Sequence, residues 1–411
     1  MSKSNYFFGQ TVLGQVLSLI PPSLVHKIAK KTSSDFAVKK FDTKCHLYTM
    51  CYGVIGDITG LRHISDGLVA MGNSLSQLGI NYVPPKSTLS DSNKNRSSDV
   101  FAQIYQALYE HYYVFLSDRT VSEPLLAKAY AIDSTTMSLF KAILKASGRK
   151  SKDGKAVGGI KSHIQISLID ELPMNIKHTS GATNDHTFLK DLILKAYDIA
   201  IFDKAYVDYQ QYAKWSSENI YFVTREKDNA KSTSILERDL PNDKDFEILK
   251  DEEVMKLYKD QNGQEQKLLL RRIVVWSEKH QDIIVLLSNM FHLEAFEISM
   301  LYRKRWRIEL LFKQLKQNFP LKYFVGDNQN AIEIQIWCVL IVNLLMTIIR
   351  IKVKNKNTSF ALLVSIIRQH AMSYLNIIKY LQNPDGLRKQ YQNSNKRNKT
   401  EKQTALVFNT S

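Results

Sequence analysis

The chain has 411 residues, 44% of them hydrophobic and 23% charged, a composition typical of a folded protein large enough for two or three domains. Its net charge of +16 predicts a polyanionic partner, most economically nucleic acid, with an anionic membrane surface as the second possibility. Three scattered cysteines exclude a disulfide framework and lack zinc-ligand spacing, so a reducing cytosol is expected. The most apolar run, residues 334–349, is short for a membrane span and predicts a buried core helix.

Residues 1 to about 125 are predicted to be helical. Pro21-Pro22 begins an amphipathic segment, a second helix ends near Ile55, and a third follows Gly60. A polar helix begins at Lys86, and a long helix rich in Tyr and Leu covers residues 99–115. No signal peptide is evident before these helices.

Short apolar strands begin at Ala129, where the character of the chain changes. Two of them are predicted to end on an acid, at Asp133 and Asp203. The predicted strands are residues 130–133, 163–169, 173–179, 199–203 and 220–225. Helices are expected from the caps near Asp185 to Lys195, and over residues 209–215. Strands that first follow one another and then alternate with helices predict an α/β domain with a mixed sheet.

The charge reverses between Glu226 and Glu265, where twelve acids face seven bases. Two further strands are predicted over residues 268–276 and 282–287, so residues from about 226 to 290 form an insertion in the α/β domain. Helices are expected again to about Leu381, followed by a basic, polar tail.

A basic helix at residues 302–316 carries a single acid, Glu309, among the seven Lys and Arg residues between positions 301 and 322. At roughly 100° per residue, Tyr302, Arg305, Glu309 and Lys316 share a sector of roughly 60°. One interpretation is an ion pair between Arg305 and Glu309 on a solvated helix. The other is a metal-binding carboxylate flanked by side chains that bind phosphate.

The two strand-end acids favour the second interpretation. Asp133 and Asp203 could each be a turn or cap residue when considered singly. Together with Glu309, they provide three carboxylates from separate elements, which suits two Mg²⁺ or Mn²⁺ ions about 3.5–4 Å apart in phosphoryl transfer. Arg305 and Lys316 would then hold phosphate groups.

These residues match the motifs of a known family. The helix matches Tyr-x₂-Arg-x₃-Glu-x₆-Lys without a gap, which resembles the signature of the DDE transposases of the insertion-sequence four family. Residues 131–136 resemble the motif of the first aspartate of that family, and residues 202–206 the motif of the second. Residues 222–225 resemble the strand that follows. Ala205 is a departure, because the family usually has Gly there.

The resemblance implies a ribonuclease H-like α/β core with a mixed sheet and a β-rich insertion, preceded by an all-helical domain. The expected domains are a DNA-binding domain at 1–125, a catalytic domain at 126–350 and a helical segment with a basic tail at 351–411. Asp133, Asp203 and Glu309 would be catalytic residues that hold two Mg²⁺ or Mn²⁺ ions. Glu252 and Glu253 are rival third acids, but they lie in the polar insertion without a basic face.

The resemblance also implies cut-and-paste DNA transposition in the bacterial cytoplasm, at the nucleoid and without a membrane partner. A homodimer in a synaptic complex would cleave double-stranded DNA at inverted-repeat ends and join it to target DNA. Tyr302, Arg305 and Lys316 would position terminal phosphates, and the helices near residues 86–96 would read the end sequence. The alternatives are a nuclease that does not join strands and a non-catalytic DNA-binding repressor derived from a transposase. An aromatic residue stacks on a flipped base in related enzymes, and Trp276 or Trp306 is a candidate, although a core position is favoured for both. Tyr206 is expected either to pack near the site or to touch DNA.

Overall fold

The computed structural model describes residues 9–72, 74–117, 124–138, 148–150, 156–181, 183–240, 247–277, 281–355, 357–386 and 388. The basic tail predicted beyond residue 388 lies outside this part of the chain. The chain divides into two compact units, one formed by residues 1–108 and 318–411 and the other by residues 109–317. Residues 318–350 thus belong to the same compact unit as the N-terminal helices, whereas the sequence-based division places its boundary near residue 350. The functional division into three domains stays a prediction.

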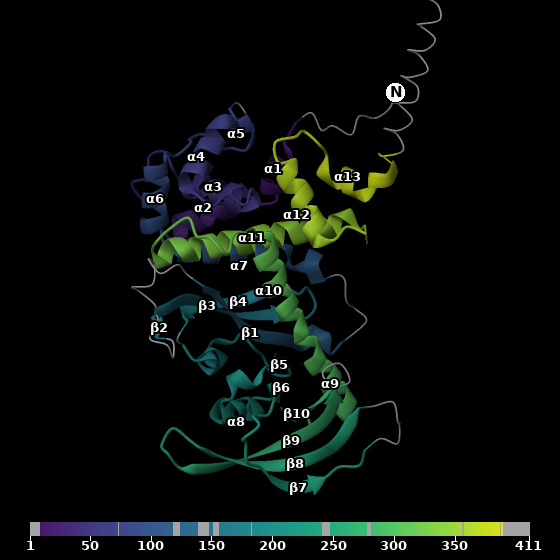
Figure 1. Cartoon of the computed structure of the whole chain (residues 1–411). Coiled ribbons are helices and arrows are strands. Elements are labelled where there is room, and N and C mark those ends of the chain that lie inside the picture. Colours follow the sequence, from purple (N-terminus) through teal and green to yellow (C-terminus); the bar gives the residue numbers. More distant parts are fainter. Residues whose placement is uncertain are drawn as a thin grey trace, which may run out of the picture. The chain divides into compact units, whose positions relative to one another are not determined.

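The first unit is helical, as the sequence predicts (Figure 1). Its N-terminal helices confirm the predicted starts at Pro22, Leu61 and Lys86. The described helices are α1 (Val12–Leu17), α2 (Pro22–Lys31), α3 (Thr43–Ile55), α4 (Leu61–Ala70), α5 (Ser74–Gln77), α6 (Lys86–Asn95), α11 (Gln329–Val353), α12 (Phe360–Gln369) and α13 (Ile377–Gln382). The helix α7 (Ser98–Ser117) crosses the boundary between the two units in sequence.

Helix α11 is the core of the first unit. It is long and apolar enough to cross a membrane by length and composition, yet 89% of its most apolar stretch is buried inside the protein. Its neighbours come from both ends of the chain, since α11 packs against α1, α3, α6, α12 and α13. The Asn330 side chain donates to the carbonyls of Asn93 and Arg96, at 2.8 Å each, which joins α11 to the end of α6. The prediction of a buried core helix over this run is confirmed.

The second unit is built on one continuous sheet, ten-stranded among the described residues. Its strands are β1 (Ala129–Ser138), β2 (Gly148–Lys150), β3 (Ala156–Ser167), β4 (Pro173–Ser180), β5 (Ile199–Phe202), β6 (Tyr221–Arg225), β7 (Thr233–Glu237), β8 (Ile248–Lys259), β9 (Glu265–Ser277) and β10 (Asp282–Ser288). The order is β2-β3-β1-β5-β6-β10-β9-β8-β7, with β4 paired to β3. Strands β4, β3 and β1 are antiparallel neighbours, whereas β1, β5 and β6 are parallel. This arrangement confirms the predicted ribonuclease H-like mixed sheet.

Strand β1 corrects one detail of the sequence analysis. The parallel pairing of β1 with β5 ends at Ile132 and Phe202, but β1 continues to Ser138 because antiparallel β3 pairs with it along this extension. Asp133 therefore lies within a strand, at the level where the parallel pairing stops. Asp203 directly follows β5, as predicted.

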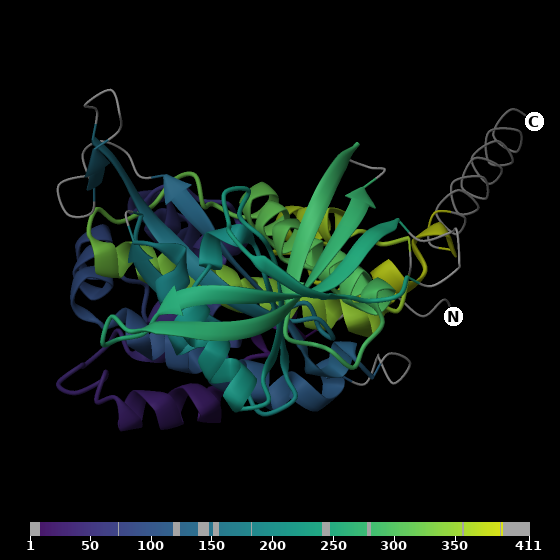
Figure 2. The same cartoon turned by 90° about the horizontal axis from the view of Figure 1, so that it is seen from below.

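The insertion extends the sheet of the core. Strand β10 pairs with β6, and β9, β8 and β7 follow outward, as the green strands in Figure 2 show. The sequence predicted β9 and β10 but missed β7 and β8, because their acidic residues did not suggest strands. On β8, Glu252 and Glu253 lie opposite Arg272 and Arg271 of β9, so cross-strand charge pairs allow this acidic segment to form a strand.

The helices of the second unit differ from prediction at two places. The helix expected to reach Lys195 is only a 3₁₀ helix, η3 (Asp185–Asp191). The predicted basic helix is divided into α9 (Ala295–Lys304) and α10 (Trp306–Asn318), which meet at Arg305 and follow one another end to end (Figure 1). Helix α8 (Tyr209–Ser217) is confirmed, and Trp215 and Tyr212 pack with Phe222 and Phe202 in the core beside the sheet.

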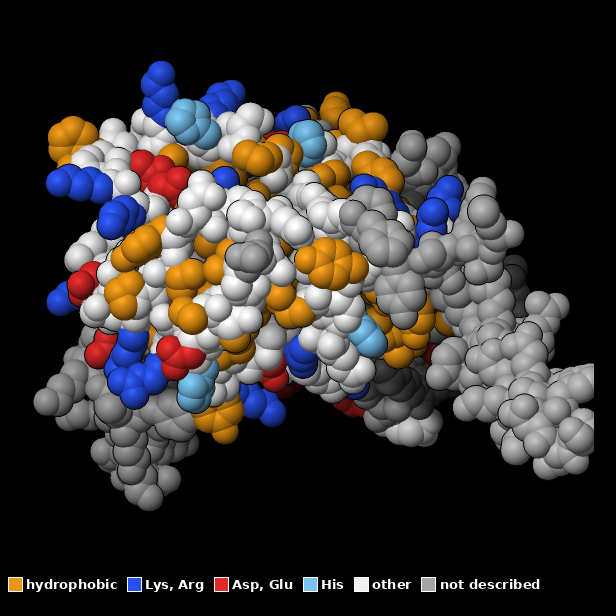
Figure 3. All heavy atoms as spheres, turned by 90° about the horizontal axis from the view of Figure 1, so that it is seen from above, with side chains coloured by type: hydrophobic (Ala, Val, Ile, Leu, Met, Phe, Trp, Pro, Cys, Tyr) orange, Lys and Arg blue, Asp and Glu red, His pale blue; other side chains and the backbone are white. Residues whose placement is uncertain are grey.

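The distribution of Lys and Arg side chains can be followed on one face of the molecule. Figure 3 shows one face of the molecule, on which Lys and Arg side chains occur at separate places between apolar and neutral ones. On this face, the charge does not form a single continuous patch.

Candidate active site

Asp133 of β1 lies at the centre of the candidate site. Its Oδ1 accepts a hydrogen bond from the Ser134 amide at 2.7 Å, and its Oδ2 lies 3.3 Å from the Arg305 guanidinium. The side chain is 22% exposed, so it is partly accessible to solvent.

Arg305 joins two of the predicted acids. Its second terminal nitrogen makes a short ion pair with Glu309, one turn later on α10. Because Arg305 stands where α9 ends and α10 begins, its guanidinium can contact a carboxylate on the sheet and one on the helix at once. The structure therefore brings together Asp133 and Glu309, which are far apart in the sequence.

Asp203 and Tyr302 belong to the same neighbourhood. The negative charges of Asp203 and Glu309 both act on Asp133, and Asp203 also acts electrostatically on Tyr302. The Tyr302 ring lies 5.9 Å from the Arg305 guanidinium carbon. Asp133, Arg305 and Glu309 are thus in contact at the level where β1 and β5 stop pairing, and Tyr302 and Asp203 lie within electrostatic reach of them.

The electrostatics of the site are those of crowded acids. Burial raises the pKa of Asp133 to about 6, and the nearby charges of Glu309 and Asp203 add to that rise, while Arg305 and the Ser134 amide oppose it. Burial also raises the pKa of the Tyr302 phenol, which is therefore neutral at pH 7. The site carries negative charge that one guanidinium only partly offsets.

Lys316 lies apart from this contact network. It is an exposed residue near the end of α10, and partial burial of its amine lowers its pKa. Helical geometry places it two turns beyond Glu309, about 10 Å along the axis and on the same face.

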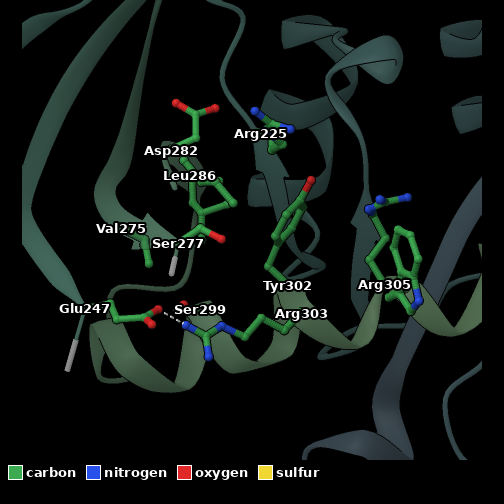
Figure 4. Close-up of a pocket in the computed structure, with 12 residues that line it drawn as sticks. Arg225, Glu247, Val275, Ser277, Asp282, Leu286, Ser299, Tyr302, Arg303 and Arg305 are labelled. Carbon is green, nitrogen blue, oxygen red and sulfur yellow. Dashed lines mark hydrogen bonds and ion pairs between the residues drawn. The ribbon is translucent and has the colours of Figure 1, made fainter. Parts of the chain in front are cut away.

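A pocket of about 730 Å³ adjoins the acids on the side of the insertion. Its lining includes Tyr302 and Arg305, together with Arg225 at the end of β6 (Figure 4). In Figure 4, the side chains of these three residues point in the same direction. Arg225 was not among the predicted site residues. The available signal was a cation that directly follows an apolar strand.

The two tryptophans that are candidates for stacking on a base, Trp306 and Trp276, differ in their surroundings. Trp306 lines the pocket and is 45% exposed, so the favoured core position was wrong for this residue. Trp276 lies on β9, between the pocket residues Val275 and Ser277, and is partly buried.

The alternatives for two other residues are also resolved. Tyr206 is fully buried and packs against Phe202, so it supports the site from within the core and does not reach the surface. Glu252 is buried and paired with Arg272 and Lys250 inside the insertion.

No three His, Cys, Asp or Glu side chains in the described part of the chain are grouped closely enough to hold a metal ion as they stand. At the candidate site, Arg305 keeps the Asp133 and Glu309 carboxylates apart, because its guanidinium lies between them and pairs with both. The oxygen-only donor set and the uncompensated negative charge nevertheless suit a hard divalent cation.

The order and directions of the central strands are those of a ribonuclease H-like core, and comparisons with known proteins identify its family. The family described as Transposase DDE domain matches residues 125–345, more than half of the chain. Residues 8–81 match a family described as Domain of unknown function (DUF4372). The chain belongs to the DDE transposase family.

Individual relatives carry the same description. The chain is 28% identical over 269 residues to a putative transposase, y4zB, of Sinorhizobium fredii, covering 64% of this chain and 71% of the relative. It is 26% identical over 272 residues to a putative transposase for insertion sequence element IS4SA of Synechocystis, with 64% and 71% covered. A probable transposase for insertion sequence element IS5377 of Geobacillus stearothermophilus is 23% identical over 242 residues, with 58% and 61% covered.

Among solved structures, a piggyBac transposase synaptic complex with hairpin DNA aligns with a TM-score of 0.41 at 13% identity, over 95% of this chain and 83% of that one. By its match to the transposase family and to the transposases named above, the protein is a transposase, and enzymes of its family act on DNA with divalent metal ions.

Proposed function

We propose that Asp133, Asp203 and Glu309 form the catalytic triad of this transposase and hold two Mg²⁺ or Mn²⁺ ions. One observation carries the proposal: the Arg305 guanidinium contacts both Asp133 and Glu309, so acids from the sheet and from α10 converge on one point. Bound there, two divalent ions would supply a lowered pKa for the attacking water or hydroxyl and stabilisation of the leaving oxygen.

The remaining residues of the site bind and orient the substrate. Arg305 and Lys316 would hold phosphates of the DNA end, Arg305 through its planar fork of donors. The neutral Tyr302 phenol would donate a hydrogen bond to a phosphate oxygen. Movement of Arg305 from the carboxylates to a phosphate would free the acids for their ligands. In this proposal, substrate and metal therefore assemble at the site together.

At the level of the whole reaction, we propose cut-and-paste transposition. Water cleaves one strand at the transposon end, and the 3′-hydroxyl so released attacks a second phosphodiester. A homodimer would bring two inverted-repeat ends together with target DNA, in the bacterial cytoplasm at the nucleoid. The N-terminal helices near residues 86–96 would read the end sequence.

The test uses the full chain, Mg²⁺ or Mn²⁺, and a labelled duplex that carries the end of the element. Cleavage followed by joining supports transposition, cleavage without joining favours a nuclease, and binding without cleavage favours a repressor. Asp133→Ala, Asp203→Ala and Glu309→Ala should each reduce cleavage at least about a thousandfold.

The matched control is Asp191→Ala, which removes an exposed carboxylate of the same unit that pairs with Lys177. This variant should cleave at the wild-type rate. Thermal unfolding of each triad variant separates a loss of folding from a loss of catalysis. Full cleavage by any triad variant would contradict the site assignment.

A further inference from the structure

A second polar cluster lies on the opposite face of the strand that carries Asp133. Successive side chains of a strand point to opposite faces, so Ser134 points away from the side chain of Asp133. Ser134 is paired in register with His163 of β3, and Lys161 lies two residues further along β3 on the same face. The first residue of η3, Asp185, packs against all three of these residues.

Asp185 holds the Ser134 hydroxyl, which donates to Asp185 Oδ1 at 2.6 Å. The Lys161 ammonium lies 3.3 Å from the same oxygen and also donates to the Thr183 carbonyl at 3.0 Å. Both charged side chains are mostly buried, with 14% of Lys161 and 21% of Asp185 exposed. A buried, charge-assisted arrangement of this kind restricts each group to one position.

Ser134 links this cluster to the candidate triad. Its hydroxyl is bound to Asp185, and its amide donates to Asp133 Oδ1 at 2.7 Å. Two consecutive hydrogen bonds therefore connect the Asp185 carboxylate to the Asp133 carboxylate, across the thickness of the sheet. Asp133 is free to turn only as far as the Ser134 backbone allows.

We propose that Asp185 is a positioning residue for Asp133, acting through the Ser134 hydroxyl and amide. The inference rests on the proposed role of Asp133 as a metal ligand. The 3₁₀ helix η3 then has a function in the reaction, since it holds β1 beside Asp133 from the opposite face of the sheet. Residues that orient a metal ligand typically contribute 10- to 100-fold to metal affinity or activity, on the order of the effect expected here.

The test measures binding of Mn²⁺ alone to the full chain without DNA. Binding is followed by the loss of the electron paramagnetic resonance signal of free Mn²⁺. Asp185→Ala and Ser134→Ala should each lower the Mn²⁺ affinity by about tenfold or more. Because both act through one path, the double variant should bind Mn²⁺ as well as the single variant that has the lower affinity. Ser134→Thr keeps the hydroxyl, and Asp185→Asn keeps an acceptor oxygen, so both should recover most of the affinity.

Asp191→Ala is the matched control, because Asp191 is the last residue of η3 and its carboxylate pairs with the exposed Lys177. Its Mn²⁺ affinity should be that of the wild type. Thermal unfolding of each variant separates misfolding from a positioning effect, since Asp185→Asn and Ser134→Thr should unfold near the wild-type temperature.

Asp133→Ala separates the two levels of the proposal. If this variant loses Mn²⁺ binding while Asp185→Ala and Ser134→Ala retain wild-type affinity, the positioning role is overturned and the triad stands. If Asp133→Ala itself binds Mn²⁺ like the wild type, the proposed triad fails. Weakening by all three, with recovery in the conservative variants, supports the inference.

Discussion

Arg305 shows how one side chain can fulfil two interpretations of the same motif. The sequence offers either an ion pair between Arg305 and Glu309 or a functional carboxylate on a basic face. The ion pair does form, and the same guanidinium also reaches Asp133 of β1. An arginine can do this because its planar fork presents several donors, which a lysine cannot match.

His46 is a buried residue whose charge state is determined by its partners. Its Nδ1 accepts from Arg96 at 2.9 Å, so its Nε2 carries the hydrogen that is donated to Asn93 at 2.7 Å. Burial, aided by the charge of Arg96, lowers the pKa of His46 to about 3. The neutral imidazole is thus part of the folded state of the first unit.

This burial predicts a loss of stability in acid. The unfolded chain takes up the proton near pH 6.5 and the folded chain only near pH 3, so the stabilisation is complete above pH 6.5 and declines as the pH falls toward 3. The free energy of unfolding should fall by up to about 1.4 kcal/mol per pH unit in this range. Urea unfolding of the wild type and of His46→Gln from pH 7 to pH 5 measures the effect. The variant should show the flatter profile, and equal slopes would contradict the prediction.

Among the elements, the insertion and helix α9 are tied together by one buried ion pair. Arg271 of β9 binds Asp251 of β8 through two nitrogens, at 2.9 and 2.6 Å, and both side chains are nearly inaccessible. Arg271 also donates to the carbonyls of Met290 and Leu293, which precede α9. The same pair therefore fixes the hairpin β8–β9 and the start of the helix that carries Tyr302.

Replacement of Arg271 should be costly for this reason. Arg271→Met leaves the buried Asp251 carboxylate with only the longer 4.0 Å contact to Arg238, and we expect a loss of about 3 kcal/mol in unfolding free energy. Asp251→Leu combined with Arg271→Met should recover most of that loss, because no buried charge remains. Urea unfolding followed by tryptophan fluorescence measures both variants. Lys177→Met, which breaks an exposed pair, should cost less than about 1 kcal/mol.

At the scale of the whole molecule, the helical unit is assembled from both ends of the chain. Helix α11 lies at its core, and the amides of Val12 and Leu13 donate to the carbonyls of Ser373 and Ala371 at 2.9 and 2.8 Å. The N-terminal helices therefore share their core with residues that follow α10 in sequence.

A fragment of residues 1–108 should consequently not fold alone. Without α11, the buried faces of α3 and α1 would be exposed to water, and the apolar area lost is a large share of the core of that unit. Circular dichroism and amide exchange of the fragment should show a largely unprotected chain. Mixing with a fragment of residues 318–411 should restore helix content and protection, whereas a fully protected fragment alone would contradict the shared core.

Much of the fold could be predicted from local pattern. Apolar runs marked most strands of the core, and prolines, glycines and caps marked most helix starts, because these signals depend on near neighbours in the chain. The acidic strand β8 could not be found in this way, since its partners are arginines on β9. The length of η3 and the extension of β1 past Asp133 were likewise missed, because packing and pairing with distant segments determine them.

The sequence by itself determined the types of chemistry available: a basic face with one acid, two acids beside apolar strands, and the motifs of a transposase family. Those features depend on residue identity and spacing alone. Only the tertiary structure decided that Arg305 lies between Asp133 and Glu309, that Ser134 is hydrogen-bonded to both Asp185 and Asp133, and that α11 belongs with the N-terminal helices. Such contacts join residues distant in the chain, so they depend on how the elements pack, which no local pattern records.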